Sequence, residues 1–98
     1  MTTIQLTLMT TFILSLLGLA LHRTHLVSAL LCIESMLVAL FMSTAALMQN
    51  TQMTTTAILP MTLLTFSACE ACTGLALLVA TTRTHATDHL KNLNLLQC

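Results

Sequence analysis

The stretch LLCIESMLVALF, residues 30–41, places a carboxylate, Glu34, inside a run of apolar and small side chains. The stretch SACEACTGLALLV, residues 67–79, does the same with Glu70. Around them, 98 residues are 56% hydrophobic and only 6% charged, with a mean hydropathy of +0.92. A soluble domain carries about 25% charged residues. The sequence therefore predicts an all-α membrane protein that has the lipid bilayer as its solvent.

Three apolar stretches each approach the ~20 residues that a helix needs to cross a bilayer. They predict one domain, residues 1–98, with three transmembrane helices at about 3–21, 26–48 and 57–80 and an interfacial tail at 81–98. Thr56 is expected to cap the third helix, and Pro60 falls in its first turn, where a missing N–H costs little.

The basic residues predict the orientation of these helices. Arg23 lies between the first two spans, and Arg83 and Lys91 follow the third, so all three lie on one side of the membrane. Because basic residues concentrate on the inner side, we expect the N-terminus outside and the C-terminus on the cytoplasmic or matrix side.

This topology predicts the depth of the two glutamates. Glu34 lies eight residues from the inner end of its helix and Glu70 ten residues from the end of the next, at about 12 and 15 Å depth. A charged residue near the middle of a membrane costs about 2.5–3.5 kcal/mol on insertion scales. Two carboxyl groups at one level therefore indicate a pathway or polar partners.

The helical faces predict what surrounds Glu34. Its own face is apolar, and the opposite face carries small residues suited to close helix packing: Ser28, Cys32, Ser35, Ala39, Ser43 and Ala46. The first helix offers a matching seam of Thr7, Thr11, Ser15 and Gly18. If these two seams pack together, Glu34 points away from the first helix. We therefore expect another polypeptide or a hydrated cavity to meet it, and hence a larger assembly.

Glu70 has hydroxyl groups close to it in sequence, from Ser67 and Thr73. Two carboxyl groups on neighbouring helices favour a proton relay, because a buried carboxyl group can take up and release a proton. Because the face of its own helix is apolar, Glu34 is predicted to be more sensitive to substitution than Glu70. The alternative is that both glutamates are protonated groups that only hydrogen-bond helices together.

Other motifs carry weaker signals. The C-x-x-C formed by Cys69 and Cys72 lies inside a membrane span, where small packing residues are the simpler interpretation. The histidines at positions 22, 25, 85 and 89 do not amount to a predicted metal site. No nucleophile with a base, phosphate loop or dinucleotide motif occurs. We predict that this chain has no redox chemistry, no bound cofactor and no nucleic-acid partner.

The whole chain resembles a known family. Its three spans, HRTHLVSALLCIESM, CEACTGLALLV and the vertebrate-like ending NLNLLQC are similar to chain 4L of mitochondrial NADH-ubiquinone oxidoreductase, respiratory complex I, the counterpart of the bacterial K subunit. Ser35 and Ala86 depart from it, since glycine is common there in relatives.

The resemblance implies a core subunit of the membrane arm in the mitochondrial inner membrane. Its expected partners are the antiporter-like chain 2 and chains 3 and 6, and Glu34 and Glu70 correspond to groups associated with proton pumping. FMN, iron–sulfur clusters and ubiquinone would belong to the complex as a whole and not to this chain.

Two other classes of function stay open. An autonomous proton-driven ring needs glycine-rich helices, and a small cation exporter uses Trp and Tyr. The chain has only Gly18 and Gly74 and contains neither aromatic residue type. A structural subunit, in which the glutamates serve assembly alone, fits the sequence as well as a proton relay does.

Overall fold

The computed structural model describes residues 2–21, 24–52, 54–86 and 90. Its main elements are α1 (Thr2–Ala20), α2 (Leu26–Thr51) and α3 (Ile58–His85), with a short 3-10 helix, η1 (Thr54–Ala57), before α3. Each of the three long helices is long and apolar enough to cross a membrane. The predicted all-α fold with three membrane-spanning helices is confirmed.

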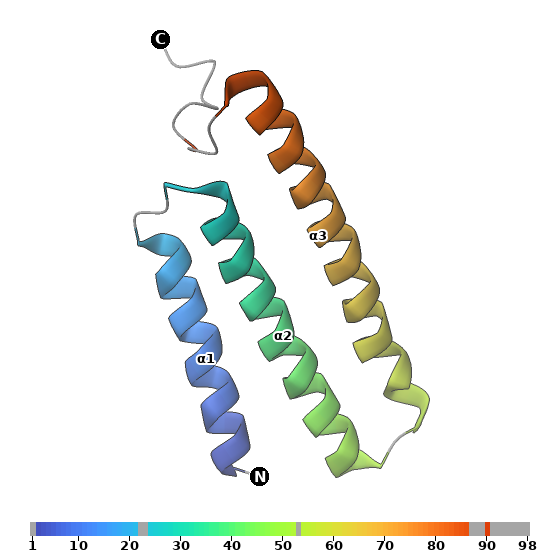
Figure 1. Ribbon diagram of the computed structural model, residues 1–98. Coiled ribbons are helices and arrows are strands. Elements are labelled where there is room, and N and C mark those ends of the chain that lie inside the picture. Colours follow the sequence, from blue (N-terminus) through green and yellow to red (C-terminus); the bar gives the residue numbers. More distant parts are fainter. Residues whose placement is uncertain (1, 22–23, 53, 87–89, 91–98) are drawn as a thin grey trace.

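The three helices lie side by side, with α2 between α1 and α3 (Figure 1). The molecule measures 52 × 25 × 20 Å, which is the shape of one layer of long helices. Because the chain crosses the layer three times, its N-terminal end and the end of α3 lie at opposite ends of the bundle. The start of α2 and the end of α3 share one end, which we call the C-terminal end.

The connection between α2 and α3 differs from its prediction. α2 continues to Thr51 and stops at Gln52, which takes a left-handed conformation (φ 49°) and donates its N–H to the Met48 carbonyl at 3.0 Å. The N-cap of α3 is Ala57 and makes no side-chain capping bond, so the expected cap at Thr56 is wrong. The turn of η1 leads into α3 instead, and Pro60 lies in the first turn of α3 as predicted.

The end of α3 also lies beyond its prediction. The helix continues through Arg83 to His85, so residues 81–85 are helical and not part of a separate tail. Ala86 stops it in a left-handed conformation (φ 60°), with its N–H on the Thr82 carbonyl at 2.9 Å. The N–H of Leu90 donates to the Thr24 carbonyl at 2.9 Å, which ties this end to the start of α2. Apart from residues 81–86 and Leu90, the expected interfacial tail lies outside the described residues.

The packing of α1 on α2 follows the predicted seams only in part. Ala39 is buried, and the small residues flanking it on its face are partly buried, except that Ser35 is exposed. On α1, Thr7 and Thr11 are exposed, and the partly buried residues are Leu8, Phe12, Ser15, Gly18 and Leu19. Large apolar side chains, and not the two threonines, therefore make this contact. Ser15 and Gly18 lie where they were expected.

Most large apolar side chains remain exposed on this chain alone. Leu6, Leu31 and Phe66 have exposed fractions of 64, 67 and 69%. Of the described residues only Ala39 and Gly74 are buried, because three helices in a row cannot enclose a core. Exposure of so much apolar surface to water would be unfavourable. It suits a chain whose outer faces contact lipid or other membrane helices.

Candidate functional site

Glu34 lies on the side of α2 that faces α3. Its Oε2 accepts a hydrogen bond of 2.8 Å from the Ser67 hydroxyl on α3. Its other oxygen, Oε1, is buried and has no hydrogen-bond partner among the described residues. The expectation that Glu34 points away from the α1 contact is compatible with this geometry. The inference that another polypeptide or a hydrated cavity must meet Glu34 is wrong for Oε2, because its hydrogen-bond partner belongs to this chain.

The close approach of α2 and α3 depends on Gly74. Leu30 lies directly against this glycine, so that a Cβ atom at position 74 would be 2.6 Å from Leu30 Cδ2 and 3.1 Å from Cδ1. Gly74 is buried in this contact. The absence of a side chain lets the two helices come close enough for Ser67 to reach Glu34.

The same contact gives the relative level of the two glutamates. Glu34 lies four residues after Leu30, and Glu70 lies four residues before Gly74. Because α2 and α3 run in opposite directions (Figure 1), each step moves about 6 Å away from the C-terminal end of the bundle. Glu34 and Glu70 therefore lie at one level of the α2–α3 pair, as the sequence predicted.

Hydroxyl groups in the helices bond almost entirely to the backbone. Within α1, α2 and α3, from Thr7 to Thr84, each Ser or Thr hydroxyl other than that of Ser67 donates to a carbonyl three or four residues earlier. Such bonds satisfy a hydroxyl within its own helix. Ser67 is the exception because its hydroxyl crosses to another helix.

This pattern reverses the expected surroundings of the two glutamates. The Thr73 hydroxyl donates to the backbone carbonyls of Cys69 and Glu70 and not to the Glu70 carboxyl group. Ser67, expected beside Glu70, bonds Glu34. Glu70 is partly buried, and no side chain of the described residues donates to its carboxyl group. Glu34 therefore has the polar partner that was expected for Glu70, and the prediction that Glu34 is the more sensitive residue loses its physical basis. The sequence could not identify Ser67 as the partner of Glu34, because 33 residues separate them.

The cysteines and histidines among the described residues do not form a common centre. Cys69 and Cys72 are exposed on α3, and Cys32 is partly buried on α2. Within the described ranges no three potential metal ligands come together. Two of the four histidines, at positions 22 and 89, lie outside those ranges, so the prediction of no metal site stays a prediction.

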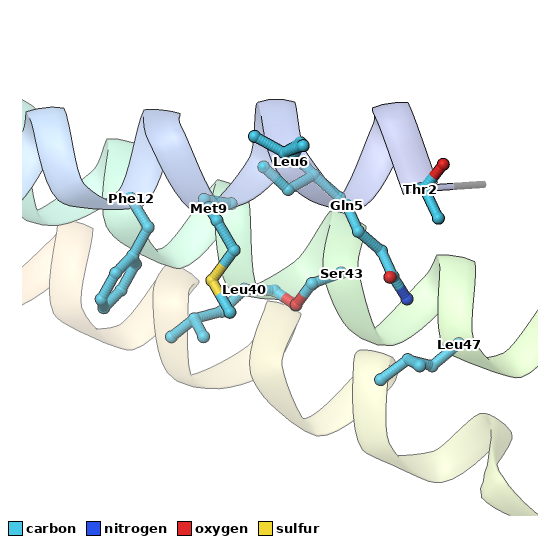
Figure 2. A pocket seen from close by; sticks show the side chains of 10 residues that line it. Thr2, Gln5, Leu6, Met9, Phe12, Leu40, Ser43 and Leu47 are labelled. Atoms are coloured by element: carbon cyan, nitrogen blue, oxygen red, sulfur yellow. The ribbon is translucent and has the colours of Figure 1, made fainter.

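A groove of about 740 Å³ lies between α1 and α2, in the half nearer the N-terminus. Figure 2 shows Met9 and Phe12 of α1 beside Leu40 of α2, with Gln5 and Ser43 as the polar groups near them. Glu34, Ser67 and Glu70 do not line this groove. The hollow and the pair of carboxyl groups are therefore separate features.

The chain matches the family profile of NADH-ubiquinone/plastoquinone oxidoreductase chain 4L over residues 3–98. It is similar to the NADH-ubiquinone oxidoreductase chain 4L of Carassius auratus, with 58% identity over 98 residues and 100% of both chains covered. The chain 4L of Squalus acanthias is 62% identical over 87 residues, 89% of each chain. That of Oncorhynchus mykiss is 55% identical over 98 residues and 100% of both chains. The family profile and these relatives span almost the full length of the chain. The chain therefore belongs to the family of NADH-ubiquinone oxidoreductase chain 4L, a subunit of respiratory complex I.

Proposed function

We propose that this subunit contributes Glu34 and Glu70 to a proton relay in the membrane arm of the complex, which couples quinone reduction to proton translocation. The observation that carries the proposal is the pair itself: two carboxyl groups at one level of adjoining helices, one of them hydrogen-bonded across the contact. Carboxyl groups at this depth are costly and occur mainly along ion and proton pathways.

The chemistry of the relay needs only protonation and deprotonation of these carboxyl groups. A neutral carboxyl group can both donate and accept a hydrogen bond, whereas a carboxylate only accepts. A proton arriving at one glutamate changes the electrostatic energy of the other, because charges interact strongly where water is excluded. This chain supplies positions for a proton, and the FMN, iron–sulfur clusters and ubiquinone of the complex belong to other chains in this scheme.

The subunit works, in this proposal, in the mitochondrial inner membrane beside the antiporter-like chain 2 and chains 3 and 6. Its N-terminus lies outside and its C-terminus in the matrix. Arg83 in the last turn of α3 supports this orientation, because an arginine at that end of a spanning helix indicates the inner side of the membrane. The exposed apolar faces of all three helices support extensive contacts with lipid and partner helices.

A structural role is the second candidate, and the bond between Ser67 and Glu34 is the observation that favours it. A hydrogen bond between membrane helices contributes about 0.6 kcal/mol on average. A bond of that size would support packing but does not require a titrating group.

Replacement of each glutamate by glutamine distinguishes the two functions, since glutamine can still accept a hydrogen bond but cannot titrate. We expect Glu34→Gln and Glu70→Gln to leave the amount of assembled complex near normal and to reduce NADH-to-quinone turnover in coupled membranes. Turnover would be measured per amount of assembled complex. Normal turnover in both variants would contradict the relay, and loss of assembly in both would support the structural role.

A further inference from the structure

The Ser67 hydroxyl donates to a different kind of acceptor from the other hydroxyls of the three long helices. Like them, it has backbone carbonyls three and four residues earlier, those of Leu64 and Leu63, to which it could donate. It donates instead to Glu34 Oε2, on a different helix, at 2.8 Å. The bond therefore orients the Glu34 side chain toward α3.

The carboxyl oxygen of Glu34 that does not bond Ser67 is enclosed by the protein. Oε1 is covered by atoms of this chain and accepts no hydrogen bond from the described residues. Neither water nor a donor from another subunit can reach a covered atom while the side chain keeps this position. Among the described residues, the bond from Ser67 to Oε2 is therefore the only hydrogen bond that holds this carboxyl group.

Taken together, these contacts describe a residue that holds Glu34 in place. We propose that Ser67 is a positioning residue, which retains Glu34 in a closed position between α2 and α3. Proton exchange at Glu34 then requires that the bond to Ser67 breaks and that the side chain turns out of the contact. This inference rests on the proposed relay, for which it supplies a step that separates holding a proton from passing it on.

The contact of Gly74 with Leu30, which lies one turn from Glu34, supports the same assignment. The contact between Leu30 and this glycine keeps α2 and α3 close on the side of Ser67 and Glu34 nearer the C-terminal end of the bundle. The helix backbones are therefore held near each other whether or not the hydrogen bond is formed. Movement of the Glu34 side chain alone, without separation of the helices, is enough to open the site.

The test measures how accessible Glu34 is in the assembled complex. Dicyclohexylcarbodiimide, a membrane-soluble reagent, modifies protonated carboxyl groups that it can reach. Its initial rate of reaction at Glu34 would be followed by mass spectrometry of this subunit in inner membranes. The variants are Ser67→Ala, which removes the hydroxyl, and Ser67→Thr, which keeps one. Ser35→Ala is the matched control, because its hydroxyl is next to Glu34 in sequence but bonds the Cys32 carbonyl.

We expect Ser67→Ala to raise the rate of Glu34 modification about two- to tenfold, the ratio that corresponds to a net hydrogen bond of ~0.5–1.5 kcal/mol. Ser67→Thr and Ser35→Ala should stay near the unmodified rate. An unchanged or lower rate in Ser67→Ala would overturn the proposal. If Ser67→Ala reduced assembly, the rate per assembled complex and the result for Ser67→Thr would still decide it.

This experiment can fail independently of the proposed function. Modification of Glu34 reports the position of its side chain and needs no turnover. If Ser67→Ala does not alter modification while Glu34→Gln blocks turnover, the relay stands and Ser67 does not position it. If Ser67→Ala raises modification while Glu34→Gln leaves turnover normal, Ser67 holds the side chain but the relay is wrong.

Discussion

The contact between Gly74 and Leu30 offers a sharp test of the α2–α3 packing. In Gly74→Ala, the new Cβ atom would be 2.6 Å from Leu30 Cδ2, 3.1 Å from Cδ1 and 3.4 Å from Cγ. Carbon atoms in favourable contact are about 3.5–4.0 Å apart. The two terminal methyl groups of Leu30 must therefore move, while Cγ is already near an ordinary contact distance.

Two opposing terms determine the size of the effect. Forcing an extra methyl group into a packed contact costs about 1–3 kcal/mol. Alanine in place of glycine inside a helix contributes about 1 kcal/mol in the other direction. We therefore expect Gly74→Ala to destabilise the subunit by about 0–2 kcal/mol, and Gly74→Leu, which adds three further carbon atoms at the same place, to destabilise it by more.

A rescue variant isolates the contact from the change in helix propensity. Leu30→Ala removes the atoms with which the new Cβ collides, so the double variant should be more stable than the sum of the two single effects predicts. The assay is the temperature at which the subunit dissociates from the purified complex in mild detergent. Additive effects of Gly74→Leu and Leu30→Ala would show that these residues do not share a contact.

Three further predictions follow from other parts of the chain. Ala86→Gly should stabilise the end of α3 by roughly 1 kcal/mol, because glycine adopts a left-handed conformation without the steric cost of a Cβ; an unchanged or lower dissociation temperature would contradict it. Replacing both Cys69 and Cys72 by alanine should leave turnover per assembled complex nearly unchanged, since α3 contains no Lys or Arg before Arg83 and no three potential metal ligands come together among the described residues; lost electron transfer would indicate a working thiol pair. In sealed vesicles, proteolysis after Arg83 should occur only from the matrix side, and cleavage from the opposite side would reverse the proposed orientation.

The sequence predicted the helices well because their signal is local. Long apolar stretches bounded by short polar ones indicate spanning helices without any knowledge of tertiary contacts. The ends were less predictable: α3 continues to His85, because a basic residue such as Arg83 can lie in the last turn of a helix as readily as after it. The level of Glu34 and Glu70 was also predictable, since it depends on residue spacing and on the antiparallel course of two helices.

The partner of Glu34 was not predictable from local patterns. Its own helical face is apolar, and the hydroxyl that meets it comes from Ser67, which sequence spacing associates with Glu70. The contact depends on how α2 and α3 are rotated and how closely Gly74 lets them approach. The available signal was Ser67, a small polar residue one turn from the partly buried Glu70. Periodicity within one helix does not say which neighbouring helix Ser67 faces.

Direct measurement of proton translocation shows whether Glu34 and Glu70 work as titrating groups. The double variant Glu34→Gln/Glu70→Gln keeps the shape of both side chains, and glutamine at position 34 can still accept the Ser67 hydrogen bond. The measurement is the number of protons moved per NADH oxidised in sealed vesicles that contain a known amount of assembled complex. If both glutamates titrate during turnover, the double variant assembles and its proton translocation is strongly reduced. Assembled complex that translocates protons at the normal ratio and rate would show that neither carboxyl group needs to titrate.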